Sequence, residues 1–248
     1  MNTIAPAPTT ATQAIKRLPP HKRIFAITLG LTGAAACNLF LGYQLFSLYS
    51  RNTTFLPYDT SSPDLATPVF KSHNKLNNPP VCIDHAVKTI PLAKLKENDL
   101  GRLTTDFCRG VWSGVGYAVQ RKILERKYKG LEGREGMLWG RKELGEAEYK
   151  VGEVVTDHFE VVEHTDDKVI VRCGDSPLNK APRPSDGLFA MEVTKDDEAQ
   201  TATFHLKSVF VDTTPDGQTA EPLPGYMQFL HRLYTKLWME SATRKLLK

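Results

Sequence analysis

The sequence predicts an α+β domain, an antiparallel sheet with a long helix at its C-terminal end, behind one transmembrane helix. An uncharged run of 27 residues stands at positions 24–50. Apolar and polar residues alternate between 148 and 212, as in strands, and apolar residues recur at helical spacing in 92–131 and 225–247. Because the strands and helices are segregated along the chain, their order is that of an α+β fold.

The uncharged run is long enough to cross a bilayer. A hydrocarbon core about 30 Å thick requires roughly 20 helical residues, and this run lacks the polar face that a helix of a soluble core would show. We therefore predict a basic N-terminal arm at 1–23, a transmembrane helix at 24–50, a flexible linker at 51–80 and a folded domain at 81–248. The membrane is thus a predicted partner of the chain.

The charge distribution sets the predicted orientation. The arm at 1–23 holds four of the 32 basic residues and no acid, and the other 28 balance the 28 acidic residues. The positive-inside rule places such an arm in the cytosol or the mitochondrial matrix, and the domain on the opposite side of the membrane. The arm also suits a mitochondrial presequence, so an endomembrane and the mitochondrial inner membrane both stay open. A neutral domain does not indicate a nucleic-acid partner.

The sequence contains no recognisable cofactor or metal motif. The four cysteines are far apart and show no paired spacing with each other or with histidine; they are Cys37, Cys82, Cys108 and Cys173. Phosphate-binding glycine loops, nucleophile elbows and zinc-protease motifs are also missing. We therefore expect no cofactor and no metal ion, while one disulfide among the last three cysteines stays open.

Proline and glycine divide the remaining chain into its expected elements. Five prolines interrupt every regular pattern in 51–80, whereas strict alternation begins at Val81, which predicts a strand over 81–90. Three glycines between 110 and 116 are expected to break the helical region into two helices. The last helix, at 225–247, has an apolar stripe over half its circumference, and we expect this stripe to pack on the sheet. The stripe consists of Tyr226, Met227, Phe229, Leu230, Leu233, Tyr234, Leu237 and Trp238.

Three stretches resemble an uncharacterised family of bacterial and fungal proteins placed in the superfamily of START-like and polyketide-cyclase-like proteins. They are FCRGVWSGVGYAVQRKIL, VGEVVTDHFEVVEHTDDKVIVRCGD and LPGYMQFLHRLYTKLWM. The resemblance covers residues 81–248. It implies a helix-grip fold, in which a curved sheet wraps the last helix and leaves an apolar cavity, and it supplies no catalytic signature.

Three polar residues fall on strand faces that we assign to the interior, because each alternates with large apolar residues. They are His85, Asp157 and Ser208. Together in a cavity, they would form the polar part of a ligand-binding pocket. Simpler interpretations are a hydrogen-bonded structural histidine for His85, a strand end for Asp157 and a bond to a backbone carbonyl for Ser208.

Three functions are compatible with these features, and whether the protein is an enzyme stays open. The first is a membrane-anchored binder or carrier of an apolar small molecule or lipid. The second is a tailoring enzyme of the cyclase or isomerase type, for which His85 could move a proton. The third is an interaction module without a ligand.

Overall fold

The computed structural model describes residues 38–248. The chain divides into two units, with the boundary between Tyr49 and Ser50. In the first unit, residues 38–49 form a helix with exposed leucines. The predicted arm at 1–23 and the first part of the predicted transmembrane helix, residues 24–37, lie outside the described residues. Among the helices of the described part, none is both long and apolar enough to cross a membrane.

The second unit, Ser50–Lys248, is built on one antiparallel sheet, which confirms the α+β prediction. Its seven strands lie in the order β1-β2-β7-β6-β5-β4-β3, so the three long strands are in adjacent positions. The strands are β1 (Thr54–Leu56), β2 (Pro80–Pro91), β3 (Val154–Val155), β4 (Phe159–His164), β5 (Lys168–Cys173), β6 (Asp186–Asp196) and β7 (Thr201–Val211).

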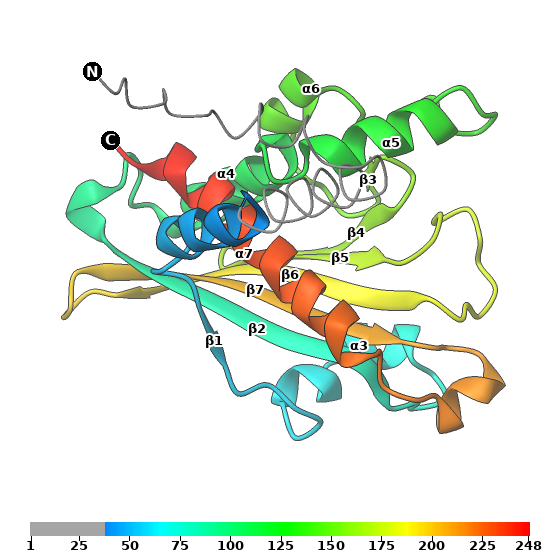
Figure 1. Cartoon of the computed structure of the whole chain (residues 1–248). Coiled ribbons are helices and arrows are strands. Elements are labelled where there is room, and N and C mark those ends of the chain that lie inside the picture. The colour runs from blue at the N-terminus through cyan, green and yellow to red at the C-terminus, as the bar shows by residue number, and fades with distance from the viewer. Residues whose placement is uncertain (1–37) are drawn as a thin grey trace, which may run out of the picture. The chain divides into compact units, whose positions relative to one another are not determined.

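Helices cover both faces of this sheet (Figure 1). The main core lies between one face and four helices, which are α4 (Leu100–Ser113), α5 (Ala118–Tyr128), α6 (Arg141–Glu146) and α7 (Gly225–Leu246). A smaller core on the other face surrounds Phe70 of α3 (Pro68–His73). Three single 3-10 turns complete the unit; they are η1 (Pro63–Ala66), η2 (Leu92–Lys94) and η3 (Pro215–Thr219).

The glycines predicted to divide the helical region do so, and they also let α7 approach. Helix α4 begins where the Asp99 side chain accepts a hydrogen bond from the backbone N–H of Arg102 at 3.0 Å, and it ends before Gly114. A Cβ atom on Gly110 would lie 2.9 Å from the carbonyl oxygen of Ala242 in α7. The glycine is therefore required for the close packing of α4 on α7.

The segment 51–80 differs from the predicted flexible linker. Its strand β1 pairs with β2, and its helix α3 buries Phe70 against the sheet. Pro63 and Pro68 stand in the first turns of η1 and α3, where proline favours a helix because the missing N–H is not needed. The prediction of a flexible linker was wrong because it treated every proline in this segment as an interruption of regular structure. The folded unit begins at Ser50, the last residue of the uncharged run.

Helix α7 has the predicted position along the chain, but the prediction that its apolar stripe packs on the sheet is wrong for its first half. Tyr226, Met227, Phe229 and Leu230 are all exposed, from 43% to 68%. The side chains of that half that face the sheet include the polar His231 and Thr235 beside Tyr234, and fully buried apolar packing begins only at Trp238. The first half of α7 therefore stands above a cavity and shows its apolar side outward.

Candidate functional site

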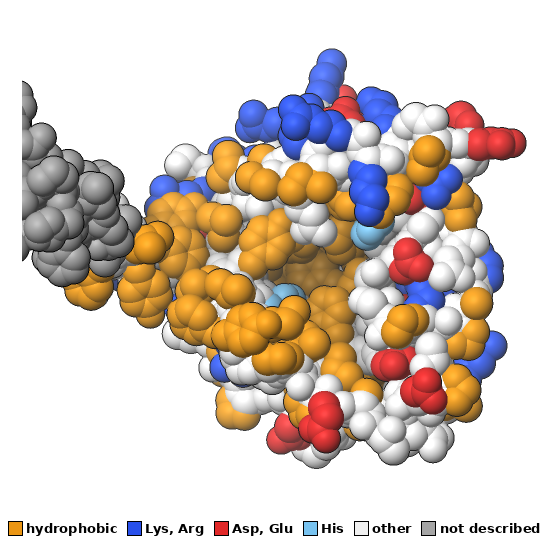
Figure 2. Space-filling view, turned by 45° about the vertical axis from the view of Figure 1, so that its right-hand side comes forward, with side chains coloured by type: hydrophobic (Ala, Val, Ile, Leu, Met, Phe, Trp, Pro, Cys, Tyr) orange, Lys and Arg blue, Asp and Glu red, His pale blue; other side chains and the backbone are white. Residues whose placement is uncertain are grey.

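A cavity of about 290 Å³ lies between the sheet and α7. Figure 2 shows a hollow on this face of the domain, bordered mainly by hydrophobic side chains, with a histidine at its rim. Aromatic rings form much of its wall, contributed by Phe159, Phe189, Phe210, Tyr234 and Trp238. Such walls favour an apolar occupant.

The aromatic wall is rigid because its rings pack on one another. Trp238 lies 5.3 Å from Phe189 and 5.0 Å from Tyr234, between ring centroids. The hydroxyl of Tyr234 donates a hydrogen bond of 2.9 Å to the side chain of Gln120 in α5. Burial raises the pKa of Tyr234 to about 12, so its hydroxyl stays protonated at neutral pH.

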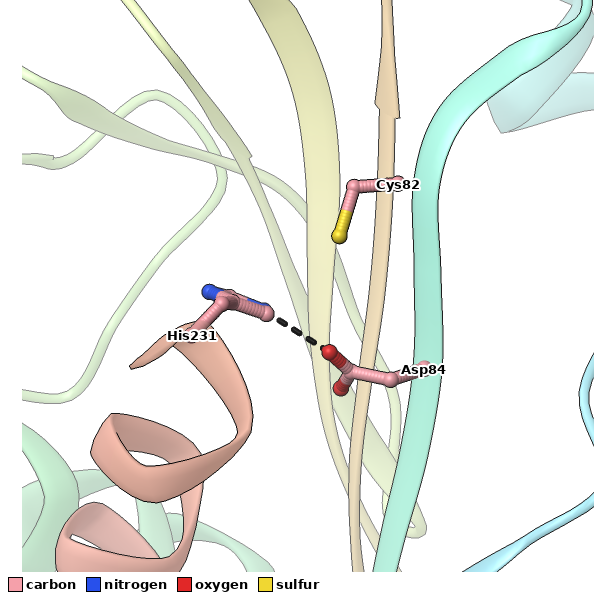
Figure 3. Close-up of side chains that lie close together, drawn as sticks. All are labelled: Cys82, Asp84 and His231. Carbon is pink, nitrogen blue, oxygen red and sulfur yellow. Dashed lines mark ion pairs between the residues drawn. The ribbon is translucent and has the colours of Figure 1, made fainter. Parts of the chain in front are cut away.

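A buried carboxylate, that of Asp84, lies behind the polar side of the cavity, next to the lining residues Ser208 and His231. Asp84 of β2 is directly opposite Ser208 of β7, and His231 of α7 reaches down to the pair. The His231 Nε2 lies 3.0 Å from Asp84 Oδ2 (Figure 3). The two side chains are in close contact, but neither His231 Nε2 nor the Asp84 carboxylate makes a hydrogen bond within the described residues.

These polar atoms lack protein partners. Asp84 is 3% exposed and Ser208 is fully buried. Within the described residues, neither the carboxylate oxygens of Asp84 nor the hydroxyl of Ser208 makes a hydrogen bond. Buried polar groups are nearly always hydrogen-bonded, and one left without a partner costs roughly 1–3 kcal/mol. The cavity therefore has one corner able to bind a polar group.

Of the three residues predicted for the site, Ser208 lies in the cavity, as expected. His85 does not, because it lies on the opposite face of β2, beside the segment that contains η1. Its Nε2 is 2.9 Å from Nδ1 of His205, and burial lowers the pKa of His85 to about 4. The assignment of His85 to the cavity side is wrong, since the residues facing α7 are its neighbours Asp84 and Ala86.

Asp157 also lies outside the cavity. It follows β3 in a turn with a positive φ of 60°, so strand parity does not apply to it. Its carboxylate accepts hydrogen bonds from Arg134 Nε at 3.0 Å and from Ser176 Oγ at 2.6 Å. Asp157 therefore anchors two loops, and the neighbouring His158 lines the cavity in its place.

The strand and helix patterns missed Asp84 and His231. Asp84 is the residue before His85 and lies on the other face of β2, the face that the strand pattern did not assign to the interior. The side chain of His231 borders the apolar stripe of α7; it is 24% exposed and faces Asp84. Cys82 is the third residue of this corner: its Sγ, one Asp84 oxygen and one His231 nitrogen all lie within 4.8 Å of one another (Figure 3).

A larger depression of about 640 Å³ lies beside α4 and α6, and it is a weaker candidate. Three of its basic side chains are already bonded to protein groups. Lys245 donates to Ser113 Oγ at 2.6 Å, Arg109 pairs with Asp106 at 3.0 Å, and Lys96 donates to a backbone carbonyl. No polar group there resembles the unpartnered carboxylate of Asp84.

Comparison of the chain with protein-family models, with curated proteins and with solved structures found no match to any of them.

Proposed function

We propose that this protein is a membrane-anchored binder or carrier of an apolar small molecule or lipid, held between the sheet and α7. The observation that carries this proposal is the aromatic cavity with a single polar corner. Ligand sites in proteins are typically apolar with a few placed polar groups, and about 290 Å³ is near the lower end of their range. The cavity suits one small apolar molecule, or one end of a longer chain.

The polar corner selects the kind of polar group that the occupant carries. The Asp84 carboxylate accepts hydrogen bonds, and the Ser208 hydroxyl both donates and accepts. A hydroxyl or amino group on an otherwise apolar molecule would satisfy both side chains. A ligand carboxylate would be repelled by Asp84, so we expect neutral or basic molecules to bind in preference to fatty acids.

The exposed apolar side of α7 supports a membrane as the source of the ligand. Tyr226, Phe229 and Leu230 stand outward on α7, and Val119 and Ile123 are exposed on α5, whose Gln120 also lines the cavity. Basic side chains gather along one edge of the same face (Figure 2). Apolar groups bordered by basic residues are typical of surfaces that rest on a bilayer.

The proposed anchor is the uncharged run at 24–50. Because the folded unit begins at Ser50, little chain separates such an anchor from the domain. The basic arm favours a domain on the side opposite to the cytosol or matrix. An endomembrane and the mitochondrial inner membrane remain equal alternatives, which a fluorescent fusion of the full chain would separate.

The arrangement of the last helix is consistent with the proposed likeness to helix-grip proteins. A seven-stranded antiparallel sheet lies under a C-terminal helix, with an apolar cavity between them. The likeness adds support to ligand binding by analogy only, since one fold serves many functions.

A tailoring enzyme is the second candidate, because His231 and Asp84 form an imidazole–carboxylate pair at the cavity. Such a pair can move a proton to or from a bound molecule. The pair of His231 and Asp84 is a different proton-transfer group from the one predicted at His85. Turnover of a bound metabolite that is lost in His231→Gln, with binding intact, would favour the enzyme over the carrier.

Ligand binding is tested with the full chain in detergent by native mass spectrometry and by titration with a fluorescent apolar amine. Ser208→Leu places a larger side chain in the cavity and should abolish binding of the probe. Val209→Leu is the matched control, because it enlarges the next residue on the opposite face of β7. Equal binding by both variants would refute the cavity as the site, and an empty wild-type protein that binds no probe would favour the interaction module.

Uptake from a bilayer needs its own test. Replacing both Phe229 and Leu230 by Glu should slow transfer of the probe from vesicles while leaving its binding in detergent unchanged. Val151→Glu, which alters an exposed apolar residue on the turn before β3, is the control. Unaltered transfer in the double variant would contradict the proposed contact of α7 with the membrane.

A further inference from the structure

Cys82, Asp84 and His231 bring three different metal-binding atoms together at the polar corner of the cavity. Cys82 and Asp84 are two residues apart on β2, so their side chains lie on the same face of the sheet. His231 approaches from α7, and all three donor atoms lie within 4.8 Å of one another (Figure 3). Thiolate, carboxylate and imidazole are all zinc ligands.

A buried carboxylate that accepts no hydrogen bond within the described residues indicates that a cation belongs there. Asp84 is 97% shielded from solvent and receives no hydrogen bond from the described residues. Lys88, a buried amine on the same face of β2, is paired with Glu240 at 2.6 Å. Arg232, the residue after His231, lies over the ring of Phe55 at 5.4 Å. An isolated ionised carboxylate is costly in such a place, and metal coordination is one of the few ways to relieve it.

We propose that Cys82, Asp84 and His231 bind one divalent transition-metal ion, with the properties of a zinc site. The donor set favours Zn²⁺ over Ca²⁺ or Mg²⁺, which require oxygen ligands. One thiolate and one carboxylate neutralise the two charges of the ion, so the occupied site would be electrically neutral, as its apolar surroundings require.

The geometry is close to that of a tetrahedral site. Zinc bond lengths of about 2.0–2.3 Å place neighbouring tetrahedral ligands about 3.3–3.6 Å apart. The His231 and Asp84 atoms are already 3.0 Å apart, and the full set spans no more than 4.8 Å. Small rotations of the Cys82 and His231 side chains would bring all three into coordination, because His231 Nε2 makes no hydrogen bond within the described residues.

Three protein ligands leave the fourth zinc position open, and His231 and Ser208 place that position beside the cavity. Structural zinc sites are closed by four protein ligands, whereas sites that bind a further molecule keep one position free. The open position would hold water or a hydroxyl or amine group of the cavity ligand. Metal binding itself needs no second molecule, so this inference is independent of the proposed carrier function.

The test uses the untagged full chain in detergent, stripped of metal, and titrated with Co²⁺ and Zn²⁺ alone. We expect one ion per chain, with the visible spectrum of tetrahedral Co²⁺ and a thiolate-to-cobalt charge-transfer band. Cys82→Ser should remove that band. Asp84→Asn and His231→Gln should each weaken binding by more than about 100-fold, because even loss of an outer-shell partner costs roughly 10–100-fold. Cys173→Ala and His205→Gln, away from the cluster, are the controls.

Thermal unfolding keeps the proposal testable if a variant is unstable. Asp84→Asn removes an uncompensated buried charge at constant size, so without metal it should unfold at the wild-type temperature or above it. Added Zn²⁺ should raise the unfolding temperature of the wild type and not that of Asp84→Asn, since only a protein that binds the ion is stabilised by it. Equal shifts in the two proteins, no shift in either, or a charge-transfer band that survives Cys82→Ser would overturn the site.

Discussion

The ion pair between Lys88 of β2 and Glu240 of α7 should be the polar contact on which the position of α7 depends most. Lys88 Nζ lies 2.6 Å from Glu240 Oε2, and the two side chains are 10% and 3% exposed. The other oxygen of Glu240 accepts a hydrogen bond of 2.7 Å from Thr53. The contact holds α7 on β2, so it fixes the register that brings His231 over Asp84.

The magnitude follows from burial. At 2.6 Å and an effective dielectric constant of 20, the attraction is about 6 kcal/mol, and much of it offsets the cost of removing both charges from water. Removing one partner leaves the other charge buried alone, which typically costs about 3–5 kcal/mol. Lys88→Met and Glu240→Leu should each lower the free energy of unfolding by that amount, out of a total of about 5–15 kcal/mol.

Combining the two substitutions should restore much of the loss, because a buried pair replaced by apolar side chains is often neutral. Urea unfolding of the four proteins in detergent, followed by fluorescence of the buried Trp112 and Trp238, completes the double-mutant cycle. Thr53→Val is a control that removes one hydrogen bond and should cost about 1–3 kcal/mol. Single variants that each lose less than 1 kcal/mol, as exposed pairs do, would refute the reasoning.

Three further predictions concern pH, packing and the cavity. Burial lowers the pKa of His85 to about 4 and also lowers that of His205. Between about pH 6.5 and 4 the unfolded chain therefore binds protons that the folded chain does not. The free energy of unfolding consequently decreases as the pH is lowered through that window. His85→Gln should reduce this fall in the free energy of unfolding, measured by urea titration, by about 1–2 kcal/mol, a value discounted because the His85 side chain is partly exposed. An unchanged slope of stability against pH would contradict this prediction. Gly110→Ala should cost about 1–3 kcal/mol in the same assay, since its Cβ would meet the backbone of Ala242 at 2.9 Å, and a neutral result would show that α4 and α7 can separate freely. Ser208→Ala should leave stability unchanged or raise it, because the hydroxyl has no protein partner, while probe binding weakens; a loss of both would make Ser208 a structural residue.

The elements of the fold follow from short-range patterns that a sequence shows directly. Alternation marked the long strands, glycines marked the end of α4, and helical spacing marked α7. These signals depend on the backbone geometry of neighbouring residues. Two local errors had local causes, since the prolines of 51–80 begin helical turns, and Asp157 stands in a turn where strand alternation stops.

The placement of Ser208 could be predicted because the other residues on its face of β7 are all apolar, namely Ala202, Phe204, Leu206 and Phe210. Which side of β2 faces α7 could not be predicted, because both faces of the strand are covered by other parts of the fold. Ile83 packs in the smaller core beside α3, while Ala86 belongs to the main core, so alternation alone cannot tell the two sides apart.

By itself, the sequence determined the uncharged run, the α+β order and the long last helix, since each depends on residues close together in the chain. Only the tertiary structure decided which side of each element faces the cavity. The contact of His231 with Asp84 depends on where α7 crosses β2, and the outward apolar face of α7 depends on the cavity beneath it. Both result from packing between segments far apart in the chain, for which a single sequence carries no local signal.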